Sequence, residues 1–198
     1  MRQHPNLIST GGSSAFSGTG VKERIWFPYY DRKDVVSATA QTLTFFQTVG
    51  VDDLVSNFEG SGAFPAGQGF IIHTMRIVPD MNARADDVAN LLKASSLLFT
   101  IENAKKYAQA PSWLYPAGVG MVSNDSLGAA AAAAPANSKA FGSNGIQSLN
   151  NAFRFKLPVK LRPQQQFKVQ LITPATISLS ATLPVYIVME GILERNLQ

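Results

Sequence analysis

Few side chains in this sequence could carry out acid–base or metal chemistry. Its 198 residues include two histidines, His4 and His73, and no cysteine. A histidine-rich metal site is therefore excluded by count, and a thiolate nucleophile or zinc–thiolate site by composition. A Ser-His-Asp triad would depend on His73, yet no Gly-x-Ser-x-Gly sequence marks a nucleophile. We interpret His73 as a core or surface residue and expect no catalytic residue, metal, cofactor or small-molecule substrate, and hence no enzyme.

Carboxylates offer two further possibilities. Glu59 and Glu102 could form the acid–base pair of a glycosidase, which the sequence alone leaves open. Asp52, Asp53 and Asn57 supply the oxygen ligands that calcium prefers, but their spacing is not that of an EF-hand loop. No motif places the members of either set together.

Hydrophobic patterning predicts that most of the elements positioning these side chains are strands. Alternating apolar and polar residues indicate a strand with one buried face, and the clearest alternation lies in residues 153–193. β-Branched and aromatic residues predict further strands at 42–49, 70–78 and 96–102. The glycines within residues 60–69 lack the following Lys and Ser/Thr of a phosphate-binding loop, so they indicate a turn.

One helix is predicted among these strands, at residues 80–95. Asn82 can cap its first turn, and the helix dipole favours Asp86 and Asp87 near that end. Residues 1–24 are polar and rich in glycine and serine, which predicts a flexible N-terminal arm. The remainder, 25–198, is predicted to be a single β-domain with a long Gly/Ala-rich loop at about 123–150.

Bulk composition favours a protein that associates with partners. Charged residues make up 15% of the chain, against about 25% in typical domains, and charged residues are depleted in the cores of interfaces. The net charge of +4 is mild. Apolar runs are far shorter than the roughly 20 residues of a membrane span, and no apolar signal-peptide core follows the N-terminus. We therefore expect a soluble protein that stays in the compartment where it is made.

Basic and aromatic residues are interleaved near the start of the chain. The basic members are Arg2, Lys22, Arg24, Arg32 and Lys33, and the aromatic members are Trp26, Tyr29 and Tyr30. Such a mixture can bind single-stranded nucleic acid through charge and stacking. The alternative is that the rings pack beneath the arm. Nucleic-acid binding and packing of the rings are compatible if the arm lines the inside of a shell. We therefore take the five basic residues as candidate inner-surface or arm contacts.

The order of these segments resembles that of the jelly-roll capsid proteins of tailless icosahedral viruses, including those of bacteria. The resemblance rests on the arm, the helix between strands, the long loop and above all the closing segments 166–171 and 185–195. It implies an all-β fold, a jelly-roll sandwich or barrel of about eight antiparallel strands with one short inserted helix. The chain is too short for the double-barrel form, so a single barrel is implied.

The resemblance also implies a structural role in a virion. The chain would assemble with itself into an icosahedral bacteriophage shell in the host cytoplasm. Its partners would be other virion proteins, with non-specific contact to the genome or an internal membrane. The alternative for the same fold is a carbohydrate- or receptor-binding module such as a spike or vertex protein. Its candidate loop contacts are Tyr107, Trp113 and Tyr115.

Overall fold

The computed structural model describes residues 22–50, 52–80, 83–102, 105–116 and 152–196. Within these ranges the chain forms eight strands, one α-helix and one short 3-10 helix. The strands are β1 (Lys22–Val35), β2 (Gln41–Phe45), β3 (Gln68–Pro79), β4 (Ser96–Ile101), β5 (Lys105–Pro111), β6 (Phe153–Leu161), β7 (Phe167–Thr173) and β8 (Leu183–Asn196). The helices are α1 (Ala85–Ala94), between β3 and β4, and η1 (Ser112–Leu114), after β5.

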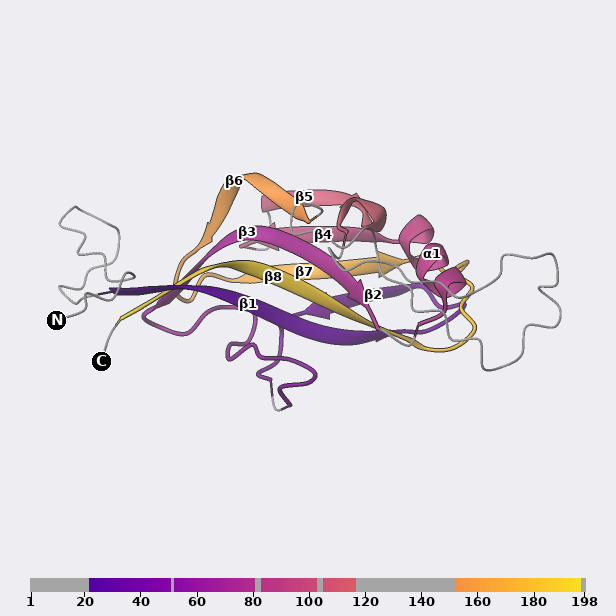
Figure 1. Cartoon of the computed structure of the whole chain (residues 1–198), viewed down its shortest axis with the longest axis horizontal. Coiled ribbons are helices and arrows are strands. Elements are labelled where there is room, and N and C mark those ends of the chain that lie inside the picture. The colour runs from indigo at the N-terminus through magenta and orange to yellow at the C-terminus, as the bar shows by residue number, and fades with distance from the viewer. Residues whose placement is uncertain (1–21, 51, 81–82, 103–104, 117–151, 197–198) are drawn as a thin grey trace.

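The eight strands form two four-stranded antiparallel sheets (Figure 1). The first sheet has the order β1-β8-β3-β6 and the second the order β2-β7-β4-β5. Each strand of the first half pairs with one of the second half: β1 with β8, β2 with β7, β3 with β6 and β4 with β5. The chain is therefore one long antiparallel ribbon that turns back between β4 and β5. Additional pairing of β3 with β8 and of β4 with β7 rolls this ribbon into two layers.

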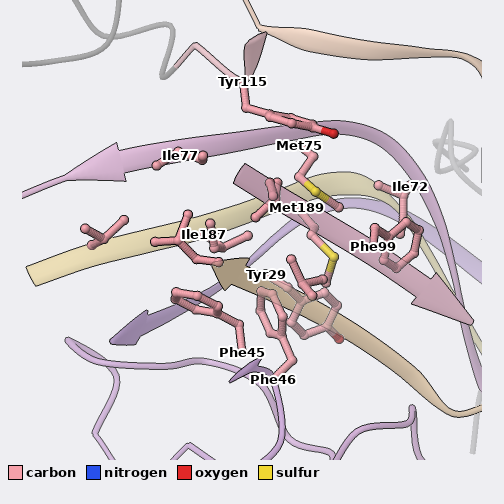
Figure 2. Close-up of a cluster of buried hydrophobic side chains, with 14 of the residues drawn as sticks. Tyr29, Phe45, Phe46, Ile72, Met75, Ile77, Phe99, Tyr115, Ile187 and Met189 are labelled. Carbon is pink, nitrogen blue, oxygen red and sulfur yellow. The ribbon is translucent and has the colours of Figure 1, made fainter. Parts of the chain in front are cut away.

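Side chains from the inner faces of both sheets form a single apolar core. Successive residues of a strand point to opposite faces, so every second residue of β7 and β8 lies in this core. Figure 2 shows residues of both sheets within it, among them Phe45, Phe99 and Ile187. Rings fill much of the space: the ring centroids of Phe64 and Phe167 lie 5.7 Å apart. Burying one such side chain contributes about 1.5–3 kcal/mol, so these rings hold the layers together.

The predicted all-β class is confirmed, and so are the strands expected at 70–78, at 96–102 and within 153–193. β2 ends at Phe45, short of residue 49, because Phe46 adopts a left-handed conformation with φ of 61°. Its backbone N–H donates a 2.6 Å hydrogen bond to Oδ2 of the buried Asp31. The carboxylate of β1 therefore ends β2 by turning the chain away from the sheet.

Two strands lie where the sequence predicted none. Residues 105–111 were expected in a loop but form β5, which pairs along β4. β1 begins at Lys22, inside the segment predicted as an arm. The predicted long loop at 123–150, and residues 1–21 of the predicted arm, lie outside the described residues. No helix in the described part of the chain is long and apolar enough to cross a membrane.

Helix α1 begins later than predicted, at Ala85, with Arg84 in the N-cap position; the predicted cap, Asn82, lies outside the described residues. Asp87 does more than face the helix dipole, since its side chain is 6% exposed and accepts hydrogen bonds from the backbone N–H and the hydroxyl of Ser180. Asn90 donates a 2.9 Å hydrogen bond to the carbonyl oxygen of Ser178. The helix is thus attached to the connection between β7 and β8.

Strand β8 approaches β3 closely at Gly191. A Cβ atom at this position would lie 1.8 Å from the backbone oxygen of Ile71, which is too close for any side chain. The register between the two strands shifts from Ile72 to Thr74, so the close approach lies beside a bulge. The absence of a side chain at Gly191 lets β8 lie between β1 and β3.

Replacing Gly191 by alanine should therefore destabilise the protein by about 1–3 kcal/mol or more, because backbone must move to admit the methyl group. The free energy of unfolding is measured by urea titration followed by circular dichroism. Val188→Ala in the same strand is the control, since Val188 is half-buried on the outer face and tolerates a smaller side chain. Equal stability of Gly191→Ala and the parent protein would contradict the close approach.

Candidate interaction surface

The basic and aromatic residues singled out in the sequence divide between the two faces of β1. Tyr29 is 3% exposed and belongs to the core, whereas Trp26 is 58% exposed. Because side chains alternate along a strand, Arg24, Trp26, Tyr30 and Arg32 share the outer face of the first sheet. Lys22, also a predicted contact, shares this face by the same alternation, whereas Lys33, another predicted contact, is at an alternate position. Arg2 lies outside the described residues.

An aromatic and aliphatic row crosses the centre of this outer face. Trp26 is opposite Ile192 of β8, which is opposite Ile71 of β3, which is opposite Lys160 of β6. The ring of His73 lies beside that of Trp26, with centroids 5.4 Å apart and planes at 48°. His73 therefore belongs to the surface, one of the two environments expected for it, and it contacts an exposed ring.

Carboxylates of β8 neutralise much of the positive charge on this face. Glu194 accepts a 2.7 Å hydrogen bond from Nε of Arg24, and its other oxygen lies 3.2 Å from Nζ of Lys160. Glu190 forms an ion pair with Arg76 and accepts a 3.0 Å hydrogen bond from the hydroxyl of Thr74. The face is a mixed-charge surface and not a continuous basic patch.

Glu194 is the most constrained of these carboxylates, at 6% exposed. Burial by itself raises the pKa of a carboxylate, but hydrogen bonds from Arg24 and Lys160, together with their charges, outweigh it. The pKa of Glu194 therefore lies below its ordinary value of 4.5. Arg24, predicted as a contact for nucleic acid, is thereby engaged within its own chain. Arg32, another predicted contact, forms an ion pair with Asp34, with 3.5 Å between Nε and Oδ1.

The outer face of the second sheet has a different character. Its central row contains Thr44, Gln170, Leu98 and Gln109, none of which is charged. Gln170 donates a 3.2 Å hydrogen bond to the hydroxyl of Thr44. The two outer faces of the sandwich therefore differ: the first carries the exposed ring of Trp26 and the ion pairs of Glu190 and Glu194, whereas the central row of the second is uncharged.

The connection between β2 and β3, residues 46–67, covers the edge of the first sheet at β1. The Asn57 side chain accepts a 2.8 Å hydrogen bond from the Tyr30 backbone N–H and donates one of 2.8 Å to the Pro28 carbonyl. The hydroxyl of Tyr186 donates a 3.0 Å hydrogen bond to the carbonyl oxygen of Leu54. These bonds satisfy an edge strand that would otherwise present unpaired backbone groups. The polar pattern of 47–63 did not indicate this role, because the partners lie in β1 and β8.

The aromatic residues predicted as loop contacts also separate. Tyr107, in β5, is 49% exposed and Trp113, in η1, is 57% exposed. Tyr115 is fully buried, its ring centroid 4.6 Å from that of Phe153, and burial raises its pKa to about 12. The expectation that Tyr115 is an exposed contact is therefore wrong, since it closes the core between the ends of β5 and β6.

The carboxylates proposed for catalysis or calcium binding form no metal-binding group within the described residues. Glu102 accepts a 2.8 Å hydrogen bond from the side chain of Gln165. Together with Arg162 and residues 163–166 it lines a hollow of about 510 Å³ between the turn after β4 and the turn after β6. Sequence reasoning missed this hollow, because its two walls are distant in the chain.

Comparison with protein-family models and with curated proteins finds no match to this chain. The interpretation of its function therefore depends on the order of its strands and the chemistry of its surface.

The Glu194 cluster makes a prediction about pH. Because the folded-state pKa of Glu194 is lowered, the stability that it contributes is present above the unfolded pKa and is lost as the pH falls through the folded-state value. Glu194→Gln should cost about 1–2 kcal/mol at neutral pH and progressively less in acid. Urea titrations from neutral pH to roughly pH 3 measure this difference.

Glu23→Gln is the matched control, since Glu23 pairs with the more exposed Arg195 near the end of the same two strands. An exposed pair contributes about 0.2–1 kcal/mol, so this variant should change little at any pH. A Glu194→Gln penalty that is the same in acid as at neutral pH would contradict the ionic role of Glu194.

Proposed function

We propose that this chain is a structural virion protein, a jelly-roll capsid subunit that assembles with itself into an icosahedral shell. The observation that carries the proposal is the strand pairing, in which β1 to β4 pair in turn with β8 to β5. A jelly roll is an eight-stranded, two-sheet arrangement of two Greek keys, and viral capsid proteins, lectins and cupins use it. A function must then be chosen among these classes from the side chains.

The interior of the sandwich favours a structural role over a cupin-like enzyme. Such an enzyme needs several histidines that converge on a metal between the sheets. Here the corresponding space holds apolar side chains, among them Phe45, Phe99 and Phe167, which are at most 1% exposed. His73 lies on the outer face beside Trp26. The described interior is therefore a packed core.

The surface favours association with other protein subunits. Large apolar side chains are exposed on several different elements, and contact with a neighbouring subunit would remove their apolar area from water. They include Trp26, Val36, Val49, Leu54, Tyr107, Trp113, Leu114 and Leu157. In a shell these residues would be covered by neighbouring copies or by other virion proteins. Any contact with the genome or an internal membrane would be non-specific, given the mixed charge of the first sheet.

A carbohydrate- or receptor-binding module is the second candidate. Tyr107 and Trp113 favour it, since both are about half exposed and lie six residues apart, Tyr107 within the edge strand β5 and Trp113 in η1. Exposed rings of this kind can stack on sugar faces. A glycan array that detects binding, lost in Trp113→Ala, would support this role over the shell.

Assembly of the purified protein tests the leading proposal. We expect particles of uniform size at high protein concentration, or in the presence of other proteins of the same virion. Light scattering coupled to size-exclusion chromatography and negative-stain electron microscopy measure this. A protein that stays monomeric under all of these conditions would contradict the shell role.

Truncation tests the proposed role of the N-terminal segment in assembly. Since β1 begins at Lys22, removing residues 1–21 leaves every described strand in place. We expect an unchanged thermal unfolding transition but impaired assembly. Removing residues 1–29 also deletes half of β1 with Tyr29, and it should prevent folding, which makes it the control. Unimpaired assembly of the first truncation would remove the segment from the proposed mechanism.

A further inference from the structure

Two segments at opposite edges of the first sheet, the connection along β1 and the strand β6, carry charges of opposite sign. From Val35 to Met75 the charged residues are Asp52, Asp53 and Glu59, all acidic. From Phe153 to Met189 they are Arg154, Lys156, Lys160, Arg162 and Lys168, all basic. The acidic residues lie in the connection along β1, whereas β1 itself carries four basic residues. Most of the basic residues of the second segment lie in or next to β6, and β1 and β6 are the edges of the sheet.

The acidic edge presents an apolar residue on a structured turn. Leu54 is 80% exposed and follows Asp52 and Asp53, which are also exposed. Oδ1 of Asp52 accepts a 2.9 Å hydrogen bond from the Leu54 N–H, and its carbonyl oxygen accepts two more from Val55 and Ser56. Tyr30 and Tyr186 donate hydrogen bonds to the carbonyl oxygens of Asp53 and Leu54. This acidic turn is therefore held in one conformation by β1 and β8.

The basic edge presents a second exposed leucine. Leu157 is 84% exposed, between Lys156 and Pro158. Residues 155–158 have no partner in β3, because the register shifts between Ile72 and Thr74, and β6 bends away there (Figure 1). At its outward positions this strand has basic residues and no carboxylate. The bend therefore offers an apolar residue within positive charge, as the acidic turn offers one within negative charge.

We infer that these two edges bind each other between neighbouring copies of the chain. The acidic turn of one copy contacts the basic bend of β6 in the next, with Leu54 packed against Leu157 and the carboxylates opposite Lys156 and its neighbours. This inference rests on the proposed shell function and names its lateral contact. Opposite-edge contact is head-to-tail, and such heterologous interfaces close into rings when the rotation between copies allows it. Complementary charge at the rim fixes register and excludes other pairings.

Charge reversal tests this contact. Asp53→Lys and Lys156→Glu each place like charges opposite each other, and neither side chain has a hydrogen bond in the described chain that maintains the fold. Each variant alone should associate about tenfold more weakly than the parent protein, as sedimentation equilibrium measures. The double variant restores opposite charges and should associate within about threefold of the parent.

Mixing the two single variants gives the sharper result. In Asp53→Lys copies, two lysines (53 and 156) would face each other, and in Lys156→Glu copies two carboxylates would, so like copies repel while unlike copies attract. An equimolar mixture should associate more strongly than either variant alone. Weakening that neither the mixture nor the double variant restores would overturn the inference, since it would reflect damage to the fold. Asp86→Lys, exposed on α1 away from the first sheet, is the control for a general effect of net charge.

Cysteine cross-linking tests directly whether Leu54 of one copy lies beside Leu157 of another. The natural chain has no cysteine, so Leu54→Cys and Leu157→Cys each introduce a single thiol. Under mild oxidation a mixture of the two should form disulfide-linked heterodimers at least about fivefold faster than either variant forms homodimers. In the control mixture, Trp113→Cys takes the place of one of these two variants, since Trp113 is exposed on η1.

The outcomes separate this contact from the shell proposal. Particles that assemble while cross-linking stays at the control rate would overturn the contact and leave the shell role standing. Cross-linked chains that never form closed particles would support the contact and contradict the shell. A monomeric protein without cross-links would contradict both.

Discussion

The position of β8 is the constraint on which the rest of the structure depends. This last strand lies between the first and third, pairs with β1 from Leu183 to Asn196, and pairs with β3 on its other side. It therefore joins segments more than a hundred residues apart in the sequence. The absence of a side chain at Gly191 permits this, since the backbone oxygen of Ile71 occupies the space that a Cβ would need. Without β8, β1 would have no partner in the sheet.

Closure by β8 also decides where charged side chains can act. Glu190 and Glu194 arrive on the outer face with β8 and meet Arg76, Arg24 and Lys160 from the neighbouring strands. These ion pairs neutralise the face that the amino-acid sequence suggested as a basic contact surface. At the edges of the sheet, the connection along β1 carries acidic residues and β6 carries basic ones. Charged groups of opposite sign are therefore available at the edges of the sheet.

The core explains why the sandwich tolerates polar edges. Rings from the connection after β2, such as Phe58 and Phe64, reach between the sheets and contact Phe167 of β7. This connection is thus held by its own buried rings as well as by hydrogen bonds to β1. Its outer turn can remain exposed and charged because its inner residues provide the stability. A surface element with this construction is preorganised, which lowers the entropy cost of binding a partner.

Local chemistry in the sequence determined the class of the fold and several of its parts. Alternation in β7 and β8 predicted strands with one buried face, because side chains of a strand alternate by geometry. The helix at α1 was predicted from a possible cap and from the acidic residues near its start. The sequence did not indicate β1 and β5 as strands. The sequence of β1, KERIWFPYYDRKDV, contains seven charged residues in 14. Glu23 and Arg24 find partners in β8, and Asp31 accepts a hydrogen bond from the backbone of Phe46 in the covering connection. Position in the sheet, not propensity, makes that segment a strand.

For the candidate interaction surface, too, some features could be predicted from the sequence and others only from the tertiary structure. Residue types alone singled out Arg24, Trp26 and Arg32 as candidate contacts. They also singled out Tyr107 and Trp113, which are exposed, although Tyr107 lies in a strand and not in the expected loop. Tertiary structure alone decided that Tyr115 is buried, that Arg24 is bound by Glu194, and that Leu54 and Leu157 lie exposed at opposite edges. The physical reason is that burial and charge pairing depend on which strands become neighbours. In this chain those neighbours are distant in sequence, so only the closed sandwich specifies them.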